Sequence, residues 1–274
     1  MGCSTDNEKD KTIALDPTFS DSKQLNKNSY NQTGLYITGR ESENFAEIQQ
    51  KDYYLNYVEK INQSWNNTTA KNLIEIEKWS RNNFISGIND SITLFYPFSG
   101  PDFLYANAFF PNAYTYLLVG LENPGKLSNI SIMDDQTKAK YLNRLLHSLR
   151  YINQSGYFST KQMMTDFADS NLNGVVHILL FYISKTKHTI MNISSVMVDD
   201  FGNCIVKQNF QNEDKNPNGI KIRFFKNSDD KIKTLYYFPI DLSDENMKDN
   251  LGFLLFLSDF GQKNTFMKSA SYIL

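Results

Sequence analysis

The sequence predicts an α+β or α/β fold, in which a mixed sheet of about five to six strands carries an N-terminal helical hairpin and flanking helices. Residues 41–65, 70–84 and 136–153 place apolar side chains at helical spacing. Segments rich in β-formers, such as 91–96 and 114–121, alternate with them. The chain is 41% hydrophobic and 14% aromatic, which is enough material for a core.

The two predicted N-terminal helices flank a polar break at residues 66–69, which favours a hairpin. Trp65 and Trp79 are expected to anchor the packing of this hairpin, not to stack on a ligand. Residues 160–168 are expected to form a further short helix.

The remaining apolar segments predict strands. Residues 174–183, GVVHILLFYI, form a continuous apolar run that is typical of a central strand. Further strands are predicted at 190–198, 220–225 and 232–238, and Cys204 is expected to be buried where a turn enters a strand. Ser243 begins a helix near 242–247, and 251–257 is expected to be buried whether it is a helix or a strand.

Residues 1–40 are predicted to be a disordered polar tether, because their few large apolar groups cannot offset the entropy of ordering. Residues 41–274 are expected to form one globular α+β domain. The last residues, TFMKSASYIL, have apolar side chains at helical spacing with no polar tail behind them. Either this helix docks its end into the core, or the chain is truncated at its C-terminus.

The first residues allow three readings. Gly2 with Cys3 occurs in myristoylated and palmitoylated proteins, but that motif requires Ser or Thr where this chain has Asp6. A plain cytoplasmic N-terminus is the second reading. The third is the end of a bacterial lipobox, whose cysteine carries a lipid anchor after a signal peptide that this sequence does not show. We favour lipidation of Cys3 and an extracytoplasmic location, because a polar tether follows it.

Segment 95–122, FYPFSGPDFLYANAFFPNAYTYLLVGLE, is the most specific feature of the chain. Its order of strand, tight turn, short helix and strand is that of a βαβ unit with a short crossover. If the strands are parallel, the turn at Ser99 lies at the carboxyl end of a strand, where α/β folds place ligands. Pro101 and Asp102 are equally explained as residues that start a helix. An anion is disfavoured there, because the carboxylate already occupies the helix N-terminus.

A catalytic site would have to be built from Ser99, Asp102, Tyr105, Glu122 and His177. The nucleophile elbow G-x-S-x-G is absent. Glu122 closes the second strand of the unit and could face Asp102, and such a carboxylate pair would suit acid–base catalysis. His177 interrupts a buried run, so a core histidine that is hydrogen bonded is the simpler interpretation.

Composition and spacing argue against several classes of function. The net charge is −2 and the basic residues are scattered, so no nucleic-acid partner is expected. No cysteine or histidine spacing fits a zinc site, and neither a metal nor a cofactor is expected. The chain has no run of ~18 apolar residues that could span a membrane. The acidic pairs 199–200 and 229–230 lie beside turn signals and are expected to be solvated.

Residues 95–125 resemble a signature shared by uncharacterised bacterial proteins, many of which look like lipoproteins. The most specific part is PFSGPDFLY at 97–105. The group has no established activity, so the resemblance implies no mechanism. It implies that relatives continue beyond residue 274, which favours truncation. The abundance of Asn, Lys, Ile and Tyr is also typical of proteins from AT-rich bacterial genomes.

Three functions are considered. The first is a lipid-anchored extracytoplasmic protein that binds a protein or small-molecule partner without catalysis. The alternative is a hydrolase-like enzyme with its site at the turn of residues 99–102, and that hypothesis fails there if Asp102 and Tyr105 are buried and bonded to local backbone. A sugar-binding module, the third possibility, requires exposed coplanar Tyr or Trp rings.

Overall fold

A computed structural model describes residues 28–66, 70–84, 92–155, 172–207, 218–226 and 229–266. The helices are α2 (Ser29–Ile37), α3 (Asp52–Ser64), α4 (Ala70–Phe84), α5 (Phe103–Phe109), α6 (Asp135–Ser155), α8 (Val176–Lys185), α9 (Asp244–Lys248) and α10 (Leu251–Ser258). The strands are β1 (Thr93–Tyr96), β2 (Thr115–Gly120), β3 (His188–Val198), β4 (Cys204–Lys207), β5 (Asn218–Lys226), β6 (Asp229–Pro239) and β7 (Lys263–Asn264). The predicted mixed fold, with helices flanking one sheet, is confirmed.

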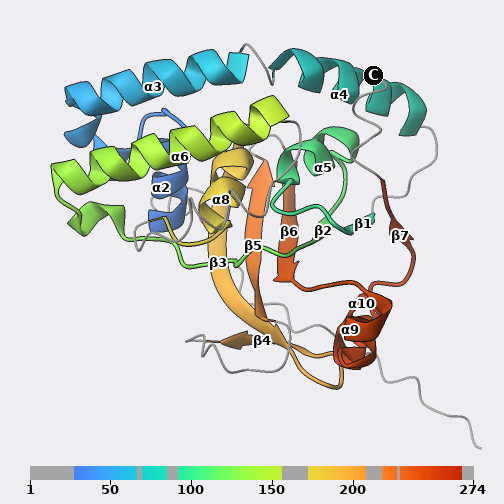
Figure 1. The fold of residues 1–274 in the computed structure, drawn as a ribbon. Helices are drawn as coiled ribbons and strands as arrows, with labels where there is room; N and C mark the ends of the chain where they lie inside the picture. Colours follow the sequence, from blue (N-terminus) through green and yellow to red (C-terminus); the bar gives the residue numbers. More distant parts are fainter. Residues whose placement is uncertain are drawn as a thin grey trace, which may run out of the picture.

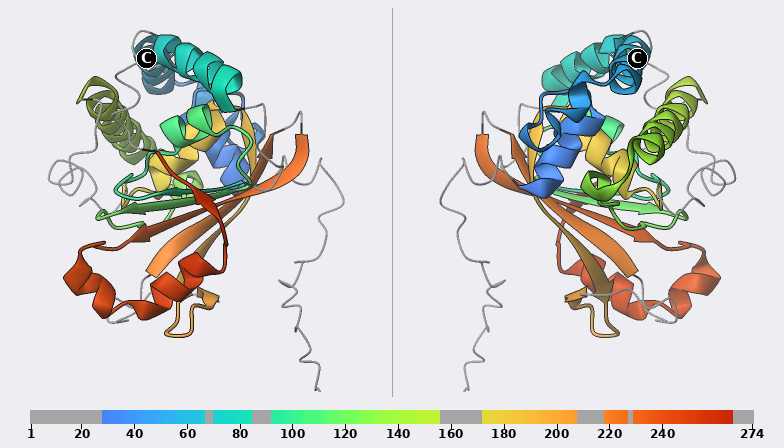
Figure 2. Two further views of the ribbon diagram at one scale, coloured as in Figure 1. Left: turned by 90° about the vertical axis from the view of Figure 1, so that its right-hand side faces the viewer. Right: turned by 90° about the vertical axis from the view of Figure 1, so that its left-hand side faces the viewer.

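The molecule has three layers (Figures 1 and 2). Helices α2 to α8 cover one face of the sheet, and α9 with α10 covers part of the other. The described strands form a seven-stranded sheet in the order β4-β3-β5-β6-β2-β1-β7. Strands β6, β2, β1 and β7 are parallel, whereas β6, β5, β3 and β4 are antiparallel. Strand β6 therefore joins a parallel half to an antiparallel half.

The segment 95–122 forms the predicted βαβ unit. Strand β1 pairs in parallel with β2, from Thr93 opposite Thr115 to Tyr96 opposite Leu118. Helix α5 connects them and packs on β2 and on α8. The turn after β1 therefore lies at the carboxyl edge of the parallel half of the sheet.

The prediction of a central strand at 174–183 is wrong, because these residues form α8. Periodicity cannot separate a buried strand from a buried helix in a continuous apolar run, since no polar face marks the period. The hydrogen bonds at the start of the segment favour the helix. The N–H groups of Val175 and Val176 donate to the carbonyls of Asn123 and Pro124 at 3.0 Å each, so the turn after β2 satisfies donors that a helix N-terminus leaves free.

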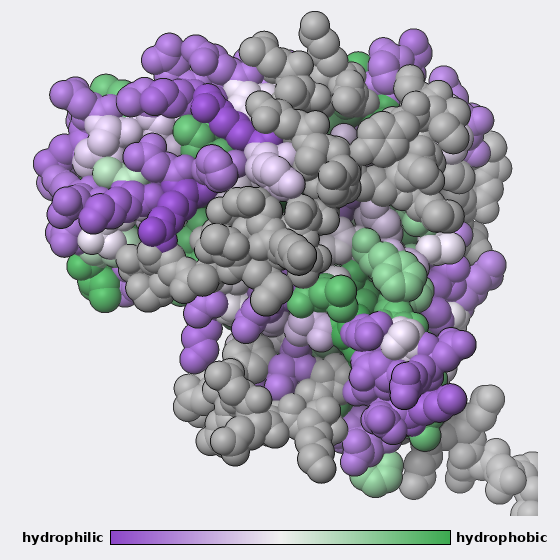
Figure 3. Space-filling model, viewed as in Figure 1, coloured by the Kyte–Doolittle hydropathy of each residue, from purple (hydrophilic) through white to green (hydrophobic). Residues whose placement is uncertain are grey.

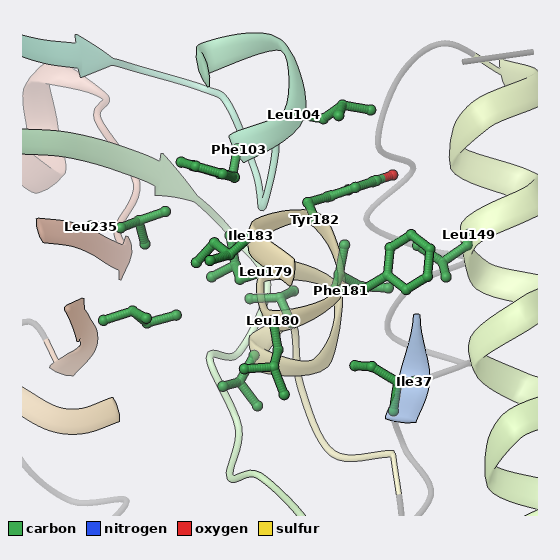
Figure 4. Close-up of a cluster of buried hydrophobic side chains, with 14 of the residues drawn as sticks. Ile37, Phe103, Leu104, Leu149, Leu179, Leu180, Phe181, Tyr182, Ile183 and Leu235 are labelled. Carbon is green, nitrogen blue, oxygen red and sulfur yellow. The ribbon is translucent and has the colours of Figure 1, made fainter. Parts of the chain in front are cut away.

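Helix α8 lies at the centre of the core (Figure 4). Every residue from Val176 to Ser184 is buried, as expected for a helix that is apolar all round. Figure 4 shows side chains of four other elements around it, namely Ile37 of α2, Phe103 and Leu104 of α5, Leu149 of α6 and Leu235 of β6. The contact with α2 is closest at Gly34, where an added Cβ would collide with the Ser184 hydroxyl.

The prediction of a disordered tether up to residue 40 is wrong for its last part. Residues 1–27 lie outside the described residues, but α2 begins at Ser29 and packs into the core. Tyr36 is fully buried, and its ring stacks on Phe45 at 4.5 Å and on Tyr54 at 4.8 Å between centroids. Asn31 accepts a hydrogen bond from the Ile190 backbone at 3.2 Å. Composition missed this helix because its buried polar side chains are bonded by distant segments, Asn31 by β3 and Gln32 by Ser42 and Asn44.

Both predicted N-terminal helices form, with two differences. The first is shorter than expected, because 41–51 contains the 3₁₀ turns Glu43–Phe45 and Ile48–Gln50 before α3. In addition, the predicted hairpin does not form: α3 packs mainly on α6 and α4 on α5, and the two helices follow one another along the top of Figure 1. The tryptophans do anchor packing: Trp65 lies edge-on to Phe181 and Trp79 edge-on to Phe109.

On the second face, the prediction for 251–257 is correct only in part. Phe253, Phe256 and Leu257 of α10 are buried against Phe238 of β6. The other side of the helix is exposed. Helix α9 begins after Ser243 as predicted, although the serine side chain makes no capping hydrogen bond. Cys204 starts β4 and is half-buried, and the helix predicted at 160–168 lies outside the described residues.

The entry into α8 depends on two glycines. Gly125 has φ 70° and Gly174 has φ 80°, and a Cβ on either would collide with the backbone of the opposite loop. We expect Gly174→Ala to lower the free energy of unfolding by about 2–5 kcal/mol, the sum of a left-handed conformation and overpacking.

Gly261→Ala is the matched control for this prediction. Gly261 also has a positive φ, 57°, but a Cβ there meets nothing within 4 Å. The control should lose only about 1–2 kcal/mol. Urea unfolding followed by circular dichroism measures both variants, and equal losses would show that the backbone contact contributes nothing.

Candidate functional site

The candidate site is the carboxyl edge of β1 and β2, which we call the crest: Phe98, Ser99, Asp102, Leu121 and Glu122. After β1 the chain turns back through Phe98, at φ 58°, and Gly100, at φ 54°. The Gly100 N–H donates to the Val119 carbonyl at 3.2 Å.

Gly120 lets this turn pass directly over the end of β2. A Cβ on Gly120 would lie 2.8 Å from Gly100 Cα and 2.6 Å from both Glu122 Oε2 and Tyr237 Oη. The absence of a side chain at this position therefore brings the two loops of the crest together with a tyrosine of β6.

The Ser99 side chain is hydrogen bonded to backbone groups. Its side chain is buried, and Oγ lies 2.8 Å from the Gly100 carbonyl and 3.2 Å from the Val119 carbonyl. Oγ also accepts the Val119 N–H at 3.2 Å. A nucleophilic serine needs a base that takes its proton. In the described part of the chain the partners of this hydroxyl are backbone groups, so the geometry of a nucleophile is not formed.

Asp102 is the N-cap of α5, as its sequence context predicts. It is 1% exposed, and Oδ1 accepts the Tyr105 N–H at 3.3 Å while Oδ2 accepts the Tyr96 hydroxyl at 3.2 Å. Burial, then the charge of Asp102 and the neighbouring Tyr105, raises the pKa of Tyr182 well above its usual value. The carboxylate thus stabilises the start of α5 and lies close to Tyr96 and Tyr182.

Glu122 is held in a second, separate arrangement. It is 4% exposed, and Oε2 accepts the Leu121 N–H at 3.2 Å and the Tyr237 hydroxyl at 3.2 Å. The same hydroxyl lies 2.8 Å from the Glu122 carbonyl. Burial and the carboxylate together raise the pKa of Tyr237, which therefore stays a neutral donor. Each acidic residue of the crest is thus paired with a different tyrosine.

His177 does not join the crest. It lies in the first turn of α8, fully buried, with Nδ1 2.9 Å from the Tyr141 hydroxyl. Burial lowers its pKa to about 4, against the smaller opposite effect of the Lys126 backbone. Tyr182, more than one turn further along α8, is the residue of this helix that approaches Asp102. His177 is therefore neutral at pH 7 and positioned in the core.

The outward side chains of the crest are apolar. Phe98 is 79% exposed and Leu121 is 62% exposed. Phe98 also adopts a left-handed conformation that costs energy for a residue with a Cβ. The crest therefore presents hydrocarbon to solvent and keeps its hydroxyl and carboxylates inside.

Other ligand-site signals are weak in the described residues. No described Tyr or Trp side chain is exposed, so these residues form no sugar-stacking platform. A shallow hollow is lined by Glu75, Lys78, Trp79, Asn82 and Asn83, all of α4. The described residues contain no group of His, Cys, Asp and Glu side chains that could hold a metal. None of their helices is both long enough and apolar enough to cross a bilayer.

No family model, curated protein or solved structure matches the chain. The sequence pattern had singled out Ser99, Asp102 and Glu122, and the structure brings their loops together. It had missed Tyr96 and Tyr237, which hold the two carboxylates. Tyr96 is only six residues from Asp102, but Tyr237 is on a strand whose pairing with β2 no local pattern reveals.

A core role for His177 predicts how stability depends on pH. The folded pKa of about 4 lies below the ordinary value of 6.5, so the unfolded chain binds more protons between these values. Stability should fall by about 2 kcal/mol for this residue as the pH drops from 7 to 5. His188, whose pKa burial lowers to about 3, should add a loss with the same sign.

Urea unfolding of the protein and of His177→Gln at pH 7 and pH 5 checks this prediction. The variant should be less stable at pH 7, but its loss between the two pH values should be smaller by about 2 kcal/mol. Identical pH dependence of the two proteins would mean that His177 is accessible to protons in the folded state.

Proposed function

We propose that the protein is a non-catalytic binding protein of a bacterial cell envelope, anchored to a membrane by a lipid on Cys3. One observation carries the binding role. At the edge where α/β folds place ligands, Ser99, Asp102 and Glu122 are buried and hydrogen bonded, whereas Phe98 and Leu121 are exposed. Exposed apolar groups favour binding by surface contact, whereas catalysis requires reactive groups that reach a substrate.

The anchoring role rests on the sequence Gly2-Cys3-Ser4 and the polar residues after it. The described domain begins at Asn28, whose side chain accepts the Tyr30 N–H at 2.9 Å and donates to the Met191 carbonyl. Residues 4–27 would therefore separate the lipid from the folded domain. This arrangement suits a domain that meets its partner away from the bilayer surface.

Lipidation of Cys3 is tested with the gene and its full upstream sequence, expressed in a bacterium. We expect mass spectrometry of the N-terminal peptide to show an acylated Cys3 and the protein to fractionate with membranes. Cys3→Ser is the matched control and should lose both the added mass and the membrane association. An unmodified cysteine on a cytoplasmic protein would contradict the proposal.

The absence of a serine nucleophile is tested with a fluorophosphonate probe. We expect no labelling of Ser99, because its hydroxyl is buried and bonded to the backbone of β2. Tryptic peptides of the treated protein are compared with those of Ser99→Ala. Labelling of the 97–105 region that disappears in Ser99→Ala would replace the proposed binding role by the hydrolase hypothesis.

A further inference from the structure

Helix α10 has more apolar surface than the sheet covers. Its sequence LGFLLFLS is apolar on all sides, and such a helix is normally enclosed. Phe253, Phe256 and Leu257 face β6, with the Phe238 ring 5.2 Å from Phe253 and 5.4 Å from Phe256.

The outer side of the helix is left open. Leu251, Leu254 and Leu255 are 61%, 44% and 48% exposed, and their spacing of three and four residues places them on one helix face.

Phe201 is a further exposed apolar residue next to α10. It lies in the turn between β3 and β4 and is 82% exposed. The turn contacts α10 at two glycines: a Cβ on Gly202 would lie 2.8 Å from Leu255 Cβ, and a Cβ on Gly252 would collide with the Asp199 carbonyl. These contacts bring the turn against the helix. We call Phe201, Leu251, Leu254 and Leu255 the α10 patch.

Acidic residues dominate the segments that form and border the α10 patch. Residues 199–203 and 241–263 contain seven carboxylates and two lysines: Asp199, Asp200, Asp241, Asp244, Glu245, Asp249, Asp259, Lys248 and Lys263. The ammonium of Lys263 is used within the fold, since it donates to the Leu257 and Gly261 carbonyls at 2.9 and 2.6 Å. None of the seven carboxylates forms an ion pair with another described residue.

The surface view agrees with this distribution. In Figure 3 the region over α9 and α10, at the lower right, is largely hydrophilic, with separate apolar areas at its margins. Hydrogen bonds from Asn203 lower the pKa of Asp199, so this carboxylate stays charged well below neutral pH. Carboxylates outnumber lysines seven to two in residues 199–203 and 241–263, and we call these two segments the acidic rim of the α10 patch.

We infer that the α10 patch docks a protein segment with apolar side chains flanked by Lys and Arg, such as one face of a basic amphipathic helix. The inference goes beyond the proposed function, because it adds a second binding surface to the crest and gives the chemistry of its partner. Leu side chains at helical spacing accept the apolar face of such a segment, and the acidic rim attracts its charges.

The same rim disfavours two other occupants. A second copy docked through this patch would place carboxylates against carboxylates, which is repulsive. An anionic bilayer surface attracts basic segments and repels this one. The charge of the rim therefore selects a basic protein partner.

The test uses the full chain and a fluorescent helical peptide of Leu and Lys, with the leucines on one face. Fluorescence anisotropy should show saturable binding of the peptide. The affinity should fall about tenfold in Leu254→Ser, because the variant lacks one leucine that the bound peptide would cover. Leu254 is half-exposed, so this variant should fold, and its unfolding curve checks that. Ile132→Ser, at a residue 81% exposed outside the patch, is the matched control and should bind like the unchanged protein.

Charge selectivity is tested with two changes. A peptide with Glu in place of each Lys should not bind, and Asp249→Asn together with Asp200→Asn should weaken binding of the Lys peptide and its dependence on salt. Equal binding of both peptides, or equal binding by Leu254→Ser and Ile132→Ser, would overturn the inference.

Two further experiments test the alternative occupants, a bilayer and a second copy of the chain. Flotation with neutral or anionic vesicles that is lost in Leu254→Ser would assign the patch to a bilayer. A dimer in sedimentation equilibrium that is lost in Leu254→Ser would assign it to a second copy. Either result overturns the inference. Failure of the patch leaves acylated Cys3 and unlabelled Ser99 unchanged, so it is distinguishable from failure of the proposed function.

Discussion

Burial of α8 is the constraint on which the rest of the structure depends. A helix with apolar side chains in every direction must be covered on every side, because each exposed leucine or phenylalanine forfeits about 1.5–3 kcal/mol. The sheet covers one side, and α2, α5 and α6 cover the others. Helix α2 has to belong to the domain for this reason, despite its polar composition.

Close backbone approach at glycines recurs where elements of this fold meet. The turn after β2 meets the entry to α8, α2 meets α8, the crest loops meet each other, and the β3–β4 turn meets α10. In each case an added Cβ would lie under 3.0 Å from another atom: Gly125 and Gly174, Gly34, Gly120, Gly202 and Gly252. The elements are thus in contact at points where no side chain fits. These positions tolerate fewer residue types than most of the apolar core.

The sequence predicted the parts whose period is visible. Strands β1, β2, β3, β5 and β6 are rich in β-formers and bounded by turn signals, and α6 is amphipathic, so each was located within a few residues. Helix α8 was misassigned because a run without polar residues has no period. The crest was located from Gly100 and Asp102, since turn and cap chemistry is local. The roles of Tyr237 and Gly120 depend on pairing between β2 and β6, and that long-range pairing is not visible in a single sequence.

The topology has a consequence for how the chain can be completed. Strand β2 ends at Gly120, but its parallel partner β6 comes much later in the chain and also pairs with β5 of the antiparallel half. A chain produced from its N-terminus has a βαβ unit with an unpaired parallel edge until β6 arrives, and such pairing across a long loop is slow. Throughout that interval the βαβ unit and the β3–β5 pair are not joined into one sheet beneath α8. The chain would avoid this exposure of strand edge and core if it stayed extended until its last strands were available.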